Sequence, residues 1–247
     1  MYGNAYGGFA SMYDALMTDA PYDIWAAYID GLLEAWFKTR EILVLDLACG
    51  TGNITMRLAQ MGYDLIGVDA SEDMLAEAQR KSYEEGFGIL FLAQDMRELD
   101  LYGTVDAAVC VCDGMSYILS EEDLLKVFER VRLFLNPGGV FIFDMNTEYK
   151  FKEVLKDSVF EDKGAGGEHY VWQNNYDPHT KINEYNMMFT TSEGETFTEL
   201  HRQRAYSPIK VQELLLEAGF GSVAIRDGYS GESLKTESSR VVFIAGG

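Results

Sequence analysis

Residues 41–53 read EILVLDLACGTGN, an apolar run that ends in an acid and a turn built from small residues. The apolar run suits a strand buried on both faces, and the NITMRLAQ that starts at Asn53 suits an amphipathic helix. Glycines at positions 50 and 52 permit a tight turn and let a ligand approach the backbone closely. The free amide groups of the next helix point into the same crevice. The stretch therefore predicts a strand, a ligand-binding turn and a helix.

Short apolar runs alternate with longer amphipathic stretches along most of the chain. Five strands with helices between them are expected at 41–48, 63–70, 88–94, 105–113 and 138–146. A helix at 207–220 and two closing strands at 222–228 and 239–247 follow. This βαβ rhythm predicts a doubly wound, Rossmann-like α/β fold with a mostly parallel sheet and right-handed crossovers.

Two parts of the chain depart from this rhythm. Within residues 148–205, segments in which side chains alternate with period 2 are separated by the turn sequences DPHT and SEGE. This pattern predicts an inserted antiparallel β lobe. The N-terminal residues carry apolar side chains at helical spacing, and we expect Ile24, Ala27 and Leu32 to pack on the body. We expect these parts: an N-terminal helical segment at 1–38, a Rossmann-like domain at 39–147 and 206–247, and the β insertion at 148–205.

The chain is strongly acidic, with a formal net charge of −20. Long-range repulsion disfavours nucleic acid and anionic lipid surfaces as partners. The start of the chain lacks a basic region followed by an apolar stretch, and no run of about 20 apolar residues occurs. We therefore expect a cytoplasmic protein with no membrane contact. The three cysteines and three histidines lack the spacing of a metal site, so we expect no metal.

The residues around the glycine-rich turn bear on the class of cofactor. Asp69 ends the second strand, where it can accept hydrogen bonds from a ribose diol. Nicotinamide cofactors fit that much equally well. The dinucleotide-binding motif, however, requires a third small residue where this chain has Thr55, and it does not require an acid such as Asp46 before the turn. A cationic ligand tolerates that acid better than a pyrophosphate does.

Acids occur in a fixed order relative to the strands, at Asp46, Asp69 and Asp95, with Gly50 and Gly52 in the first turn. In this order the chain resembles the class I S-adenosylmethionine-dependent methyltransferases of the small-molecule type. The resemblance spans most of the chain, including the LNPGG turn and the EAGF helix end. It implies a seven-stranded sheet in the order 3-2-1-4-5-7-6. It also implies S-adenosylmethionine as cofactor and S-adenosylhomocysteine as product.

The same resemblance assigns roles to particular residues. Asp69 would hold the ribose, Asp95 the adenine amino group, and the backbone around Ala48 and Cys112 the methionine part. Ala48 departs from the glycine that many members have there, but alanine still allows close approach. The expected cofactor-binding residues are Tyr13, Tyr22, Trp25, Asp46, Ala48, Gly50, Gly52, Asp69, Ala70, Met74, Asp95, Met96, Cys112, Asp113 and Tyr117.

The YD and YDxW pairs at Tyr13 and Tyr22 resemble a helical lid of small-molecule methyltransferases, so the segment 1–38 is expected to be that lid. In the insertion, His201 and Gln203 share one strand face, which could roof an acceptor pocket. An amine acceptor must lose a proton before attack. We rank Tyr13 and His201 first as catalytic residues, with Asp113 and Tyr117 as alternatives.

Other readings of the insertion stay open at this point. His169 could also act as a base, although a histidine on a sheet edge is more often solvated or hydrogen-bonded. Arg202 and Arg204 could hold a substrate carboxylate, but pairing with surface acids is the simpler expectation.

We therefore expect a methyltransferase acting on a nitrogen or oxygen of a small molecule, as a monomer or homodimer. The alternatives are an RNA or protein methyltransferase and a non-catalytic protein that binds S-adenosylmethionine. A nicotinamide-dependent oxidoreductase is a third class, which the Thr55 argument disfavours.

Overall fold

The computed structural model describes residues 10, 13–14, 17–163, 169–191 and 194–247. Its main sheet has seven strands in the order β10-β11-β5-β4-β1-β2-β3, which confirms the expected fold class and strand order. Neighbours from β3 to β5 are parallel, whereas β11 runs antiparallel to both β5 and β10. The strands are β1 Leu43–Leu47, β2 Asp64–Asp69, β3 Leu90–Ala93, β4 Val105–Cys110, β5 Leu135–Asn146, β10 Ser222–Asp227 and β11 Arg240–Gly246.

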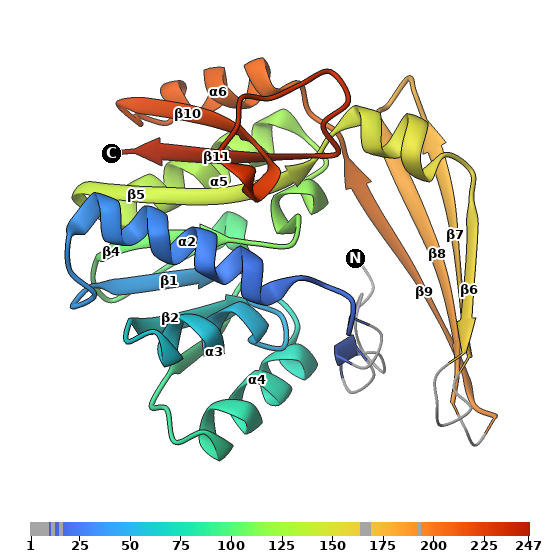
Figure 1. Ribbon diagram of the computed structural model, residues 1–247, viewed down its shortest axis with the longest axis horizontal. Coiled ribbons are helices and arrows are strands. Elements are labelled where there is room, and N and C mark those ends of the chain that lie inside the picture. Colours follow the sequence, from blue (N-terminus) through green and yellow to red (C-terminus); the bar gives the residue numbers. More distant parts are fainter. Residues whose placement is uncertain (1–9, 11–12, 15–16, 164–168, 192–193) are drawn as a thin grey trace.

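Helices cover both faces of this sheet (Figure 1). The longer ones are α2 Tyr22–Phe37, α3 Asn53–Gln60, α4 Glu72–Glu84, α5 Glu121–Phe134 and α6 Pro208–Glu217. One apolar core joins α5 and α6 to the sheet, and a second joins α2 and α3 to its other face. Ser71 and Ser120 cap α4 and α5 by accepting hydrogen bonds from the amides of Met74 and Asp123. No helix in the described ranges is long and apolar enough to cross a membrane.

The expected buried face of α2 was partly wrong. Ile24 is 61% exposed and Ala27 is also exposed, whereas Leu32 is half-buried and packs on the core as expected. The buried stripe consists of Tyr22, Trp25, Ala26, Ile29 and Leu33. This face is preferred because it buries two large aromatic rings, which remove more apolar surface from water than Ile24 and Ala27 would.

The insertion forms a separate four-stranded antiparallel sheet in the order β6-β7-β8-β9. Its strands are β6 Val159–Lys163, β7 His169–Asp177, β8 Ile182–Thr190 and β9 Thr196–Arg204. Figure 1 shows this sheet standing across the carboxyl ends of β1 and β4, with the π-helical turn η3 Lys150–Leu155 leading into it from β5. Of the N-terminal segment, Ala10 and Tyr13 pack with Met74 of α4 and Phe189 of β8. The expected lid at 1–38 falls partly outside the described residues.

Candidate cofactor and acceptor site

The turn after β1 adopts the left-handed backbone that its small residues permit. Ala48, Gly50 and Gly52 have φ angles of 57°, 55° and 78°. A Cβ added at Gly50 would meet nothing within 4 Å, so space lies open above that residue. A Cβ at Gly52 would instead lie 3.1 Å from the Cβ of Ala78. Gly50 therefore leaves room for a ligand, whereas Gly52 allows α3 and α4 to pack closely.

Asp69 at the end of β2 holds this turn in shape. Its Oδ2 accepts a hydrogen bond of 2.8 Å from the Gly50 amide, and its Oδ1 accepts one of 2.8 Å from the Ser71 amide. Burial raises the pKa of Asp69. Each carboxylate oxygen can accept more than one hydrogen bond, so the group retains capacity for ligand hydroxyls.

Asp46 lies beneath the turn and is almost completely buried. The Thr55 hydroxyl donates a hydrogen bond of 2.5 Å to its Oδ2. Burial raises the pKa of Asp46 to about 7, so its charge is poorly compensated by the protein alone. Thr55 is thus a site residue that sequence reasoning used only to argue against a dinucleotide.

Asp95 follows β3 and caps the short helical turn η1 Met96–Glu98. It accepts a hydrogen bond of 2.9 Å from the Arg97 amide and pairs with the Arg97 guanidinium. Hydrogen bonding from Arg97 lowers the pKa of Asp95. The carboxylate is therefore ionised and oriented, and Arg97 is a second neighbour that the sequence analysis did not single out.

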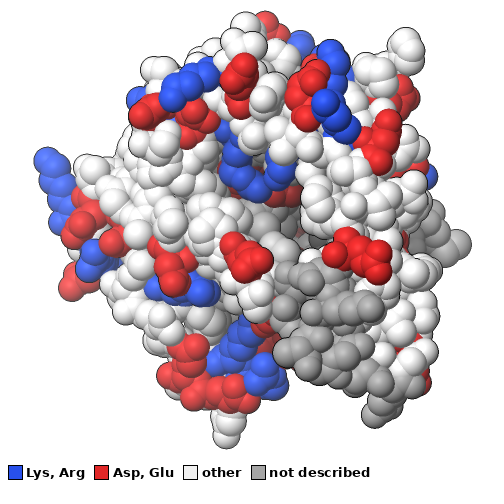
Figure 2. Space-filling model, turned by 45° about the vertical axis from the view of Figure 1, so that its right-hand side comes forward, with Lys and Arg blue, Asp and Glu red and all other residues white. Residues whose placement is uncertain are grey.

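These residues surround one cavity of about 900 Å³ that reaches from the glycine-rich turn to β9. Figure 2 shows the molecule hollowed between its two halves on this side. The expected site residues that line the cavity are Tyr13, Tyr22, Asp46, Ala48, Gly50, Asp69, Ala70, Met74, Asp95, Met96, Cys112, Tyr117 and His201. Trp25, Gly52 and Asp113 are not among its lining residues.

Trp25 and Asp113 instead join a buried polar cluster behind the cavity. Arg240 pairs with Asp113 at 2.8 Å, pairs with Asp144, and places its guanidinium 5.2 Å from the Trp25 ring centre. Gln203 of β9 donates a hydrogen bond of 2.6 Å to Asp113. Burial opposes ionisation of Asp113, but the charge of Arg240 prevails and its pKa is lowered. The cluster thus ties the main sheet to the inserted sheet.

Cys112 and Asp113 follow β4 with φ angles of 64° and 56°, a conformation that is unfavourable for residues with side chains. The Asp113 amide points at the Asp144 carboxylate, 3.2 Å from Oδ2, which offsets that cost. Burial raises the pKa of the Cys112 thiol to about 11. Cys112 therefore faces the cavity as a neutral thiol.

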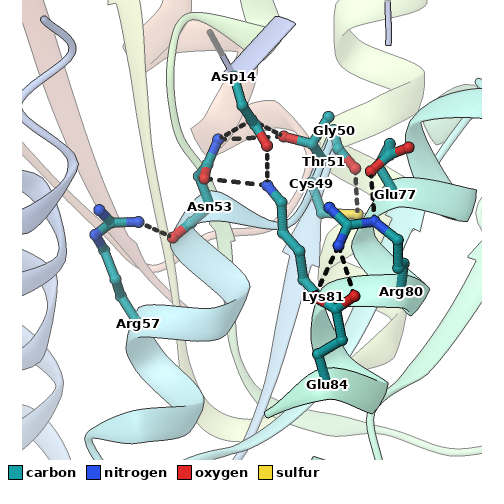
Figure 3. Close-up of polar contacts among 10 residues, drawn as sticks. All are labelled: Asp14, Cys49, Gly50, Thr51, Asn53, Arg57, Glu77, Arg80, Lys81 and Glu84. Atoms are coloured by element: carbon teal, nitrogen blue, oxygen red, sulfur yellow. Dashed lines mark hydrogen bonds and ion pairs between the residues drawn. The ribbon is translucent and has the colours of Figure 1, made fainter. Parts of the chain in front are cut away.

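Asp14 fastens the N-terminal segment to the glycine-rich turn (Figure 3). Its Oδ1 accepts hydrogen bonds from the Thr51 hydroxyl at 2.7 Å and from the Asn53 amide at 2.8 Å. The Lys81 ammonium of α4 pairs with its other oxygen. Burial opposes ionisation, but the hydrogen bonds lower the pKa of Asp14. We call Asp14, Thr51, Asn53 and Lys81 the N-terminal latch.

The inserted sheet contributes the far wall of the cavity. His201 of β9 is buried and lines it, while His169 pairs with Glu161 at 2.7 Å and is not a lining residue. Arg202 pairs with Glu184 at 2.7 Å, as expected for a surface arginine, although it also borders the cavity.

Comparisons with known proteins place this geometry in a family. A family model described as "Methyltransferase domain" matches residues 44–139. The Bacillus subtilis (strain 168) protein named "Putative methyltransferase YqeM" is 37% identical over 244 residues, covering 97% of this chain and 96% of that protein. The structure of a S-adenosylmethionine-dependent methyltransferase from Clostridium acetobutylicum has a TM-score of 0.87 and 30% identity, covering 98% of this chain and 99% of that one. The chain belongs to the S-adenosylmethionine-dependent methyltransferases.

A partial match is the glycine/sarcosine N-methyltransferase of Halorhodospira halochloris, 34% identical over an alignment of 140 residues, with coverages of 47% of this chain and 52% of that protein. Together the comparisons confirm the expected family and S-adenosylmethionine as the cofactor.

The cavity fits a cationic cofactor by its charge. Its lining carboxylates are Asp46, Asp69, Asp95, Asp123 and Glu199. The lining arginines are Arg97 and Arg202, and each is already paired with an acid. The space over Gly50 is open to a ligand. A sulfonium with an ammonium group is favoured in such a field, while a pyrophosphate is repelled.

Proposed function

We propose that this methyltransferase acts on a small molecule, at a nitrogen or an oxygen, within the cavity between the main sheet and the inserted sheet. The observation that carries the proposal is that one cavity has cofactor-type residues on one wall and β9 on the other. At about 900 Å³ it lies within the size range of small-molecule sites. The partial relative that is named a glycine/sarcosine N-methyltransferase supports a small acceptor.

Asp69 and Asp95 would hold the ribose and adenine of the cofactor, and the backbone at Ala48 and Cys112 its methionine part. When bound, S-adenosylmethionine supplies an activated methyl group on a positively charged sulfur. The chain's own contribution is to align the acceptor with that methyl group and to keep water out. Alignment of this kind can supply about 7–11 kcal/mol of the barrier.

We assign Tyr13 the role of covering the bound cofactor as part of a lid. It lines the cavity and lies within hydrogen-bonding range of Tyr22 and Cys112. It also packs with Met74 of α4 in the main body and with Phe189 of β8 in the inserted sheet. We assign the role of a lid to 1–38 and that of a substrate lobe to 148–205.

The alternative acceptors are RNA and protein. On the face shown in Figure 2, basic residues are interspersed with acidic ones and form no continuous basic surface. With a net charge of −20, this disfavours a polyanionic substrate. A protein that only senses the cofactor would need no acceptor wall, whereas β9 lines the cavity here.

The direct experiment uses S-adenosylmethionine labelled in its methyl group. The protein is incubated separately with total RNA, with a protein extract and with the small-molecule fraction of a cell extract. We expect label in the small-molecule fraction alone. Label in RNA or protein would contradict the proposed acceptor class, and tight cofactor binding without any transfer would favour a sensor.

Asp69→Asn provides the matched test of the cofactor site. Loss of a charged acceptor for hydroxyl groups should weaken S-adenosylhomocysteine binding by about 10- to 100-fold in calorimetry. Asp64→Asn, at the exposed start of the same strand, should bind normally. Equal affinity in the two variants would show that Asp69 does not hold the ribose.

A further inference from the structure

Three side chains at the β9 wall form a continuous hydrogen-bonded chain. The Nε2 atom of His201 lies 2.8 Å from the Glu199 carboxylate, and its Nδ1 lies 3.2 Å from the Tyr117 hydroxyl. The exposed fractions of the His201 and Glu199 side chains are only 2% and 9%. All three residues line the cavity. Glu199 and Tyr117 thus engage the imidazole from opposite sides.

The chemistry of the partners fixes where the protons lie. A carboxylate can only accept, so Nε2 of His201 carries the hydrogen that is donated to Glu199. In the neutral imidazole Nδ1 is then an acceptor, and the Tyr117 hydroxyl donates to it. A hydroxyl that donates a hydrogen bond can also accept one, so a group in the cavity can donate to the Tyr117 oxygen.

Strand β9 and the residues after it hold the loop that follows Tyr117 in place. The Tyr206 hydroxyl donates to the Ile118 carbonyl at 2.7 Å, and Arg204 of β9 donates to the Leu119 carbonyl at 2.9 Å. The chain on the C-terminal side of Tyr117 is therefore bound to β9 and to the residues after it. Such support pre-organises a catalytic group.

The charges around the hydrogen-bonded residues Tyr117, His201 and Glu199 select the kind of acceptor. Both arginines of the cavity wall are already paired, Arg97 with Asp95 and Arg202 with Glu184, so the lining carboxylates leave an excess of negative charge. An aliphatic amine enters as an ammonium ion, which this field attracts. As an ammonium ion it has no free lone pair and must lose a proton before it can attack.

We propose that Tyr117, His201 and Glu199 form a proton relay that deprotonates a primary or secondary amine acceptor, an inference that rests on the proposed function. The ammonium gives a proton to the Tyr117 oxygen while the Tyr117 hydroxyl proton passes to Nδ1 of His201. The imidazolium formed is stabilised by Glu199. The freed nitrogen lone pair forms the new bond to the methyl carbon, and the methyl–sulfur bond breaks with its electron pair left on sulfur.

Tyr117 is then the catalytic residue, and His201 and Glu199 act through it. With the small-molecule fraction as probe, Tyr117→Phe and His201→Gln should each lower the initial rate of methyl transfer by at least about 100-fold, while S-adenosylhomocysteine affinity stays unchanged. Glu199→Gln should also lose activity, and Glu199→Asp should recover part of it because the charge is retained. Glu161→Gln is the matched control: it breaks the His169–Glu161 pair of the same sheet, neither member of which lines the cavity, and it should keep wild-type activity.

Two further measurements make the inference falsifiable apart from the proposed function. Nitrogen-15 spectra of the wild-type protein should show the neutral imidazole of His201 protonated at Nε2 and unprotonated at Nδ1, and the opposite tautomer would overturn the relay. Acetylating the amines of the extract should abolish labelling, and persistent labelling would overturn the amine class. If the untreated extract shows no labelling at all, it is the proposed function that fails.

Discussion

Asp46 is a buried carboxyl group that is expected to lie near the cationic part of the cofactor. Burial raises its pKa from 3.8 to about 7, so near neutral pH a substantial fraction of the carboxyl is protonated. A bound cation favours the ionised form, so cofactor binding releases a proton and strengthens as pH rises towards 7. We expect Asp46 to contribute an increase of about tenfold in S-adenosylmethionine affinity between about pH 6 and about pH 8, measured by calorimetry.

Asp46→Asn is the control because it cannot ionise. The ratio of wild-type to variant affinity cancels the titration of the cofactor's own amino group and isolates Asp46. The sign for stability is opposite: with its pKa raised on folding, Asp46 lowers the stability of the cofactor-free protein as pH rises from about 4 to about 7. A ratio that does not change with pH would show that Asp46 does not interact with the cationic part.

Single residues were predictable from sequence where their role is local to a turn. Asp46, Asp69 and Asp95 each lie at or near the carboxyl end of a strand, and the parallel sheet brings such positions to one edge. Glu199 was missed although it lies two residues from its partner His201 on the same strand face, whereas the contact of His201 with Tyr117 joins residues 84 positions apart and forms only where the insertion docks. No local pattern records such a contact.

At the scale of elements, the N-terminal latch links a segment that lines the cavity to the glycine-rich turn and α4. Asp14→Ala removes all three interactions. The Asp14 side chain is 37% exposed, so solvent screening limits the loss to about 1 kcal/mol. If the segment is a lid, this should speed cofactor dissociation about fivefold in stopped-flow measurements.

Two α4 variants give a matched pair for the latch. Lys81→Met removes one ion pair of the latch and should show a smaller increase in the dissociation rate. Arg80→Met, at the next position, removes only contacts to Glu77 and Glu84 within the same helix and should leave the rate unchanged (Figure 3). Dissociation as slow in Asp14→Ala as in wild type would exclude a gating role.

The existence of most elements could be predicted because apolar periodicity and serine caps are local signals. The face of α2 that is buried against the sheet could not be predicted, since its sequence has apolar side chains around most of the helix circumference. Which stripe is buried depends on partners: Trp25 stacks on Tyr229 with ring centres 5.4 Å apart. That contact joins residues about 200 positions apart and leaves no trace in the local pattern.

At the scale of the whole molecule, the order of the main sheet followed from family resemblance, but the placement of the inserted sheet did not follow from any pattern. Part of what holds it is the cluster of Arg240, Asp113, Asp144 and Gln203. Asp113 follows β4, Asp144 lies in β5, Arg240 begins β11 and Gln203 lies in β9. Asp113, next to Cys112, therefore connects both sheets, because it binds Arg240 of the main sheet and Gln203 of the inserted sheet.

Arg240→Met should consequently destabilise the entire protein. The variant leaves two buried carboxylates without their cation, which costs about 3–5 kcal/mol of the free energy of unfolding in urea. Arg240→Lys retains the charge without the two-pronged geometry and should lose less. Arg132→Met is the control, because Arg132 is half-buried and its guanidinium donates a hydrogen bond to a backbone carbonyl, that of Gly219. Since Gln203 binds Asp113, amide hydrogens of β9 should also exchange faster in Arg240→Met, and wild-type stability with unchanged exchange would show that the cluster does not couple the two sheets.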